Sequence, residues 1–220
     1  MTIKQVWFVR HAESRANVGG ESRISGDSVL TERGRRQAVL VSERLKKVPV
    51  DAIISSTLVR AAETAAHIAD KKETHFERHD LFVERKFPNE LLGKHRRDED
   101  TRQKYALWEQ SFLYSGRRVG DGENYDLLFQ RAKDIFSYIE ERPEEKLIVV
   151  THGYLMRMVV AHAYFGETLT AEMFRSFETV VKTTNTGIFE FMWNRKGIKR
   201  WEVITWNDYA HLGYKDSRIL

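Results

Sequence analysis

The fold is decided by residues 3–17, which read IKQVWFVRHAESRAN. A run of apolar and β-branched residues at 6–9 ends abruptly in the polar pair Arg10 and His11. Because this run is too short for a helix of ordinary length, it predicts a strand that is buried on both faces. Ligands of open α/β sheets bind beyond the carboxyl ends of the strands, so Arg10 and His11 are predicted to lie at a binding edge.

Length and composition are those of an ordinary globular protein. The 220 residues include 41% hydrophobic and 31% charged residues, and three prolines without a low-complexity tract give no sign of a linker. The net charge of +4 comes without a long basic run, so we expect no nucleic-acid partner. The lack of cysteine excludes disulfides, zinc–thiolate sites and thiol nucleophiles. With no signal-peptide pattern and no apolar run of membrane-spanning length, we expect a cytoplasmic protein without a membrane partner.

Strand and helix patterns alternate along the chain. Helices are predicted at 31–47, 58–70, 101–114, 125–142 and 154–165, and strands at 50–55, weakly at 76–82, and at 146–150. Thr31 would cap the first helix, and Ser56 or Thr57 the second. Residues 188–193 and 198–206 flank turn residues at 194–197 and predict a hairpin. The alternation predicts an α/β fold, a three-layer sandwich with helices on both faces of a mainly parallel sheet.

The position of Arg60 has two interpretations. It lies in the first turn of the helix predicted at 58–70, where its charge opposes the helix dipole, which favours anions at helix N-termini. This indicates either a bound anion nearby or a solvent-exposed arginine tolerated at a slight cost. Both interpretations stay open at this point.

Several predicted strands carry functional groups to the same edge of the sheet. The groups that follow them are Arg10, His11, Arg60, His152 and Gly153. Two imidazoles and two guanidiniums suit phosphoryl transfer through a phosphohistidine, because one imidazole attacks phosphorus in line while the other groups hold its oxygens. Gly153 permits a tight turn, and the helix after it would point backbone N–H groups at the anion. A carboxylic acid must protonate the departing oxygen, and Glu84, directly after the strand-like LFV, is the candidate.

Five motifs in order resemble those of the histidine phosphatase superfamily, whose founding members are the cofactor-dependent phosphoglycerate mutases. The motifs are RHAES with Asn17, SGDSVLTERGRRQA at 25–38, SSTLVRAAETA at 55–65, VERKF at 83–87 and VVTHG at 149–153. The likeness extends to NTGIFEF at 185–191 and WNDYAHL at 206–212, so it covers most of the chain. It implies a phosphoglycerate mutase-like fold in a single domain, 1–220. Residues about 94–121 match poorly, as expected of a variable substrate-cap insertion.

The resemblance also implies a role for each site residue. His11 would be the phosphorylated nucleophile, and Glu84 would donate the proton and later act as base for the water that releases phosphate. The phosphate would be held by Arg10, Asn17, Arg60, His152 and Gly153. Ser25 and Gly26 fall where family members contact substrate through a loop, although two extra residues precede them here. No metal and no cofactor are implied.

Two departures from the mutases favour a phosphatase. Mutases follow the glutamate with Arg-His-Tyr-Gly, whereas Glu84 is followed by RKFP. Mutases also carry a WRRSY-like segment whose arginines hold the substrate carboxylate, and the best match, WEQSF at 108–112, replaces both cations. A glycerate carboxylate would lose two charge-assisted contacts of roughly 1.5–3 kcal/mol each. We therefore expect a metal-independent phosphatase that hydrolyses phosphate monoesters through a phosphohistidine on His11.

Two alternatives stay open. The first is a phosphoglycerate mutase that holds the carboxylate elsewhere, for example through Arg96, Arg97, Arg117 or Arg118. The second is a non-catalytic module that binds a phospho-ligand or a protein with the same pocket. The expected partner is a small phosphorylated metabolite whose identity the sequence leaves open. The oligomeric state also stays open, and the edge of the predicted hairpin offers one route to a homodimer.

Overall fold

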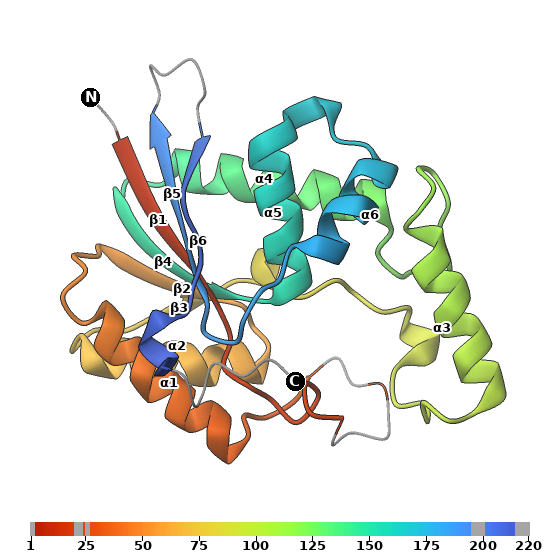
Figure 1. Cartoon of the computed structure of the whole chain (residues 1–220), viewed down its shortest axis with the longest axis horizontal. Helices are drawn as coiled ribbons and strands as arrows, with labels where there is room; N and C mark the ends of the chain where they lie inside the picture. Colours follow the sequence, from red (N-terminus) through yellow and green to blue (C-terminus); the bar gives the residue numbers. More distant parts are fainter. Residues whose placement is uncertain (1–2, 20–23, 25–26, 195–200, 214–220) are drawn as a thin grey trace.

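A six-stranded sheet crosses the molecule in the order β3-β2-β4-β1-β5-β6 (Figure 1). The computed structural model describes residues 3–19, 24, 27–194 and 201–213. The strands are β1 (Ile3–Arg10), β2 (Ala52–Ser55), β3 (Glu77–Arg78), β4 (Lys146–Thr151), β5 (Ile188–Asn194) and β6 (Trp201–Asp208). The first four run parallel, whereas β5 pairs antiparallel with β1, and β6 with β5. The predicted mainly parallel sheet is therefore confirmed.

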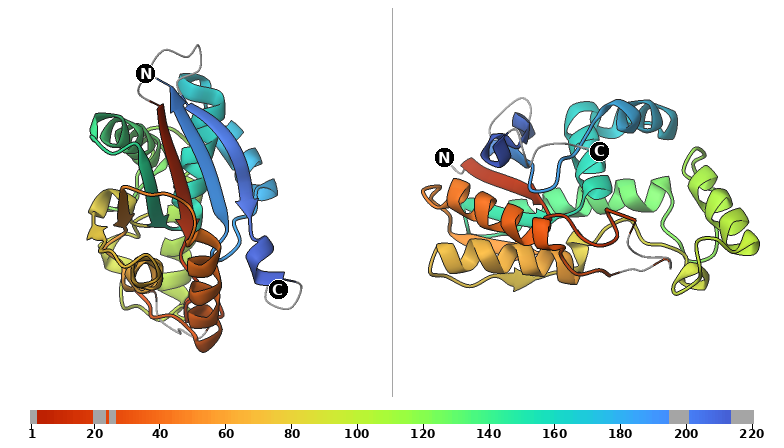
Figure 2. Two further views of the ribbon diagram at one scale, coloured as in Figure 1. Left: turned by 90° about the vertical axis from the view of Figure 1, so that its left-hand side faces the viewer. Right: turned by 60° about the horizontal axis from the view of Figure 1, so that its bottom comes forward.

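Helices cover both faces of this sheet (Figure 2). On one face lie α1 (Glu32–Leu45) and α2 (Val59–Lys71), and on the other lie α4 (Tyr125–Glu141) and α5 (Gly153–Phe165). Each helix buries one apolar side against the strands, which is how a sandwich of this kind forms its core. The three-layer architecture predicted from the sequence is confirmed.

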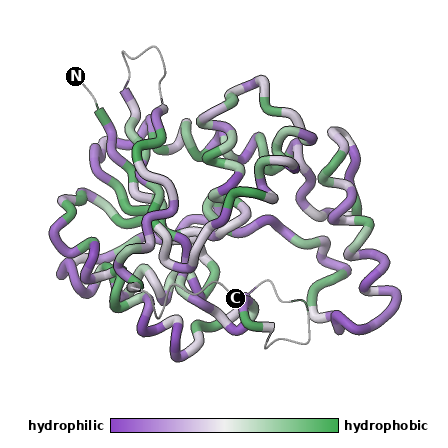
Figure 3. Tube along the Cα trace, viewed as in Figure 1, coloured by the Kyte–Doolittle hydropathy of each residue, from purple (hydrophilic) through white to green (hydrophobic). Residues whose placement is uncertain are grey.

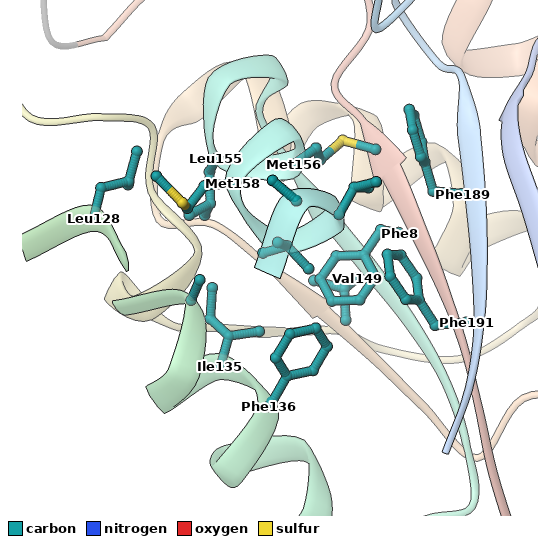
Figure 4. Packing of buried hydrophobic residues seen from close by; sticks show 14 of the residues in the cluster. Phe8, Leu128, Ile135, Phe136, Val149, Leu155, Met156, Met158, Phe189 and Phe191 are labelled. Atoms are coloured by element: carbon teal, nitrogen blue, oxygen red, sulfur yellow. The ribbon is translucent and has the colours of Figure 1, made fainter. Parts of the chain in front are cut away.

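The burial of β1 on both faces follows from its alternating side chains. Val6 and Phe8 belong to the core cluster with α4 and α5, whereas Trp7 and Val9 belong to the cluster with α1 and α2. Successive residues of a strand point to opposite faces, so an apolar run of four residues serves both clusters. Figure 4 shows the first cluster, in which Phe8 lies beside Val149 of β4.

The two helix starts differ in how well they were predicted. Thr31 caps α1 as expected, and its hydroxyl accepts a hydrogen bond from a backbone N–H in the first turn. The start of α2 has Leu58 at its N-cap without a side-chain cap, so the prediction of Ser56 or Thr57 is wrong. Instead Asp27 Oδ1, from a distant loop, accepts the N–H of the first residue of α2 at 2.8 Å.

The remaining elements are short, apart from α3 and α6. The weak strand expected at 76–82 is two residues of β3 followed by a 3₁₀ helix. Besides the elements already named, the chain forms the 3₁₀ helices η1 (Asp80–Phe82), η2 (Asn89–Leu91), η3 (Gly166–Thr168) and η4 (Ala210–Leu212), and the α-helices α3 (Glu99–Ser111) and α6 (Ala171–Val180). β5 and β6 form the predicted antiparallel pair. Of the turn expected at 194–197, residues 195–197 lie outside the described residues. Among the helices that the structure describes, none combines the length and apolar character needed to cross a membrane.

Residues 94–121 contain α3, which stands apart from the sheet (Figures 1 and 2). The chain that leads into it is hydrophilic, as the purple trace at the right of Figure 3 shows. This segment therefore contributes little to the core of the sandwich. It lies on the side of the molecule toward which the carboxyl ends of the parallel strands point (Figure 1).

The register of the parallel strands brings their carboxyl ends level. Arg10, the last residue of β1, pairs with Thr151 of β4, and Ser55 of β2 pairs with the residue before Thr151. The next residues continue this alignment, because His11 N donates to Thr151 O at 2.8 Å. The side chains that follow the three central parallel strands therefore emerge side by side.

Candidate active site

His11 presents an unprotonated ring nitrogen inside the protein. Its Nδ1 lies 2.7 Å from Ala12 O. Since a carbonyl oxygen only accepts, Nδ1 carries the proton in the neutral ring and Nε2 keeps its lone pair. Arg60 Nε donates to Nε2 at 3.2 Å. Burial, followed by the charges of Arg60 and Arg10, holds the pKa of His11 well below its usual range, so the ring is neutral and suited to nucleophilic attack.

Arg10 enters the same site from the end of β1. Its Nη1 donates to Thr183 O at 2.5 Å, while its buried Nε has no hydrogen-bond partner among the described residues. Burial lowers the pKa of Arg10 to about 10, an effect that Glu84 opposes. A buried guanidinium with a free N–H is the arrangement that an oxyanion would complete.

Arg60 is buried at the start of α2, with 8% of its surface exposed. Its Nη1 lies 4.0 Å from Asp27 Oδ1, the atom that also accepts the first N–H of α2. The protein thus places a carboxylate of its own at the start of this helix, where the dipole favours an anion. The interpretation of Arg60 as a solvent-exposed side chain is wrong, because the residue faces His11 in the interior.

His152 lies next to His11, with 5.0 Å between the two ring centroids. Its Nε2 is 2.8 Å from Ser56 Oγ, and its buried Nδ1 has no partner among the described residues. Burial, then the charge of Arg60, lowers the pKa of His152 well below its usual range. Ser56 Oγ already accepts from Leu58 N, so its proton is available to His152 Nε2. In that arrangement His152 Nδ1 carries a proton that has no acceptor in the described structure.

The loop after β1 is fixed by Asn17 and Asn185. Asn185 Nδ2 donates to His11 O at 2.9 Å and to Asn17 Oδ1 at 3.1 Å. Asn17 Oδ1 also accepts from Ser14 N at 3.0 Å. Asn17 therefore lies in the loop beside His11, with its oxygen engaged in holding that loop. Asn185 was missed as a site residue, because its only signal was its position in a turn-forming NTG sequence.

Glu84 lies at the N-terminus of α5. Its two carboxylate oxygens accept the N–H groups of Tyr154 at 3.2 Å and of Leu155 at 3.1 Å. The expectation that the first turn of α5 would offer its amides to a phosphate is wrong for these two groups, because Glu84 occupies them. A carboxylate in this position is favoured by the helix dipole.

A buried ion pair holds the segment that carries Glu84. Arg131 of α4 pairs with Glu123 at 2.6 Å and donates to the carbonyl oxygens of Leu81 and Val83, at 3.1 and 2.5 Å. Sequence reasoning missed Arg131. The available signal was a cation at helical spacing from Leu128 within the buried stripe of α4.

Arg85, the residue after Glu84, joins this segment to α3. Its guanidinium lies between the rings of Trp108 and Phe112, 3.7 and 4.1 Å from their centroids, and its Nη1 pairs with Glu109 at 3.0 Å. Glu109 of the WEQSF segment therefore neutralises a cation of the protein itself. A stacked and paired arginine of this kind fixes α3 against the segment at 84–87.

A cavity of about 370 Å³ opens beside Arg60 and Glu84. Its walls come from the start of α2, the chain around Glu84 and the end of the segment at 94–121. The lining residues are Thr57, Leu58, Arg60, Asp80, Val83, Glu84, Arg85, Lys86, Phe87, Asn89, Leu92 and Asp121. This volume suits a small molecule. The sequence offers four arginines that could instead bind a substrate carboxylate, Arg96, Arg97, Arg117 and Arg118. None of them is among the described residues that line this cavity.

The other predicted site residues divide into two groups. Gly153 lies against Arg10, because a Cβ at this position would be 3.1 Å from Arg10 Nε. Ser25 and Gly26 lie outside the described residues. Within the described part of the chain, no group of three or more His, Asp or Glu side chains is placed to hold a metal ion.

Comparison with known proteins gives one family and several relatives. The model of the histidine phosphatase superfamily (branch 1) matches residues 6–208. The metal-independent phosphoserine phosphatase of Arabidopsis thaliana is 28% identical over 96% of this chain and 84% of its own length. Phosphoglycerate mutase-like protein 4 of the same plant is 28% identical over 94% of this chain and 86% of its own. The structure of Bacillus stearothermophilus YhfR is similar with a TM-score of 0.77 at 24% identity, covering 95% of this chain and 99% of that one.

Proposed function

The chain belongs to the histidine phosphatase superfamily (branch 1), and we propose that it is a metal-independent phosphatase that hydrolyses phosphate monoesters through a phosphohistidine on His11. The observation that carries this proposal is the neutral His11 ring, whose Nε2 lone pair faces Arg60 Nε at 3.2 Å. A nucleophile has to be unprotonated and next to the groups that stabilise the charge it generates. The relationship to a metal-independent phosphoserine phosphatase favours the same function.

In the first half-reaction His11 Nε2 attacks the phosphorus atom in line. The N–P bond forms as the P–O bond to the leaving group breaks, and Glu84, which has to enter this step protonated, gives its proton to the departing oxygen. Arg60 and the free Nε of Arg10 hold the phosphoryl oxygens, and the Nδ1 proton of His152 takes a third position. These donors are buried, so their attraction for the developing charge is stronger than it would be in water.

In the second half-reaction water replaces the leaving group. Glu84, now a carboxylate, takes a proton from the water molecule as its oxygen attacks phosphorus. The N–P bond breaks, its electron pair returns to His11 Nε2, and inorganic phosphate leaves. Residues 94–121 form the cap of this site in the proposal, since α3 is attached to the segment at 84–87 through Arg85.

The test is hydrolysis of an aryl phosphate and of a panel of small phosphate monoesters in the presence of a metal chelator. We expect phosphate release that the chelator does not reduce, and a phosphoprotein that is labile in acid. His11→Ala should lose both the turnover and the acid-labile phosphate, and phosphorylation retained in this variant would contradict the assignment. Conversion of 3-phosphoglycerate to 2-phosphoglycerate with a bisphosphoglycerate primer, faster than hydrolysis, would identify a mutase. No phosphate release from any ester would identify the non-catalytic alternative.

A further inference from the structure

Lys86 is a cation on the cavity wall whose side chain has no partner among the described residues. It lines the 370 Å³ cavity, and its ammonium group makes no hydrogen bond or ion pair with the described residues. Its backbone is fixed on both sides by Glu123, because Lys86 N donates to Glu123 Oε2 at 3.1 Å and Glu123 N donates to Lys86 O at 2.9 Å. The wall therefore places this side chain beside the space that a leaving group would occupy.

The other two cations of the cavity are already used. Arg60 donates to His11 Nε2 and serves the phosphoryl group in the proposed reaction. Arg85 is paired with Glu109 and stacked between two rings, with only 4% of its surface exposed. Lys86, by contrast, is an exposed residue that lines the cavity. A negative group on the substrate beyond the phosphate would therefore find its counter-ion in Lys86.

The carboxylates of the cavity are held by neutral donors. Asp80 Oδ1 accepts from Thr57 Oγ1 at 2.6 Å, and Asp121 Oδ1 accepts from Asn89 N at 2.8 Å. Neither of these hydrogen bonds neutralises the carboxylate. Among the described residues, the cavity thus offers one unpaired ammonium together with carboxylates. This combination suits a small leaving group that carries both an anionic group and an ammonium or hydroxyl group.

We propose that Lys86 determines substrate specificity by binding a carboxylate on the leaving group, so that the substrate is a small phosphorylated amino or hydroxy acid. This inference rests on the proposed phosphatase function for the position of the leaving group. Lysine reaches the carboxylate as a compact point charge on a flexible stem, whereas the phosphate is held by the buried arginines. The phosphate and the carboxylate are therefore recognised by separate cations.

The experiment uses two substrates that differ only in this group, O-phosphoserine and O-phosphoethanolamine. We expect the parent protein to prefer O-phosphoserine in kcat/KM. Lys86→Met should reduce the ratio of the two kcat/KM values at least tenfold, mainly through KM for O-phosphoserine, because one charge-assisted contact is lost. Lys86→Arg should keep most of the preference, and Lys86→Glu should reverse it. Lys47→Met, which removes an exposed lysine outside this cavity, is the matched control and should leave the ratio unchanged.

Binding separates this inference from the function on which it rests. Calorimetry of both ligands with His11→Ala, which cannot form the phosphohistidine, measures the same preference without turnover. Loss of the binding preference in His11→Ala/Lys86→Met would support the role of Lys86 even if the parent hydrolysed nothing. A parent protein without preference for the carboxylate, or an unchanged ratio in Lys86→Met, would overturn the proposal.

Discussion

A single methyl group at Gly153 should impair catalysis without unfolding the protein. In the structure a Cβ at this position would lie 2.7 Å from Thr183 Oγ1 and 3.1 Å from Arg10 Nε. The first distance is shorter than real Cβ contacts, so the Thr183 hydroxyl has to move. The direct contact with Arg10 Nε shifts the guanidinium, and any movement of the Thr183 backbone adds to it, because Thr183 O is the acceptor of Arg10 Nη1. Gly153→Ala therefore moves a group that would bind the phosphoryl oxygens.

The size of the effect lies between two limits. Complete loss of a transition-state donor costs about 10²–10³ in rate. A misplacement of 1 Å costs about 10²-fold, so a shift of a few tenths of an ångström should reduce kcat/KM by about tenfold. Stability should change little, because alanine is favoured over glycine in a helix by about 1 kcal/mol while overpacking costs about 1–3 kcal/mol.

The assay pairs phosphate release from an aryl phosphate with urea denaturation. We expect Gly153→Ala to fold cooperatively and to lose activity, and Gly153→Ala/Thr183→Ala to recover part of it, because the 2.7 Å contact disappears. Thr183→Ala alone is the control, since it keeps the backbone carbonyl that Arg10 uses. A folded Gly153→Ala protein with kcat/KM within twofold of the parent would refute the reasoning.

Two further predictions follow from Glu84 and the two histidines. Glu84→Gln should slow alkyl phosphates by about 10²–10⁴ and nitrophenyl phosphates far less, because only a poor leaving group needs the proton; equal slowing in steady-state assays would point to another acid. Because the pKa values of His11 and His152 are both lowered by burial, the unfolded chain binds more protons than the folded one below about pH 6.5, and the free energy of unfolding should fall as the pH falls from there. His152→Gln should reduce this slope by up to about 1.4 kcal/mol per pH unit, measured by urea denaturation between pH 7.5 and 5, and an unchanged slope would contradict a neutral buried ring.

Much of the site could be predicted because it follows the strands directly in the sequence. Arg10, His11 and His152 come immediately after buried apolar runs, and the parallel register brings such ends to one edge. The tautomer of His11 was not predictable, since it depends on a backbone carbonyl that the turn places 2.7 Å from Nδ1. Asp27 at the start of α2 was missed for a similar reason, because a loop more than 30 residues earlier delivers it.

The environment of Glu84 depended on contacts between distant segments. The sequence placed this residue near the edge, but its hydrogen bonds reach Tyr154 and Leu155, about 70 residues away. The partners that hold its segment, Arg131 and Glu123, come from α4 and from the chain just after residues 94–121. The hydrophobic periodicity of α4 shows which of its residues are buried, but it does not show which backbone carbonyls will accept hydrogen bonds from a buried arginine.

The placement of Arg85 has a consequence for anyone who wants to re-engineer this protein. Arg85 is one peptide bond from Glu84, and its guanidinium donates to Trp108 O and to Glu123 O. A helix α3 grafted from a relative would bring a different surface to this guanidinium and so pull on Glu84. The unit to transfer is therefore residues 84–88 together with 108–123, because exchanging α3 alone would disturb the position of Glu84.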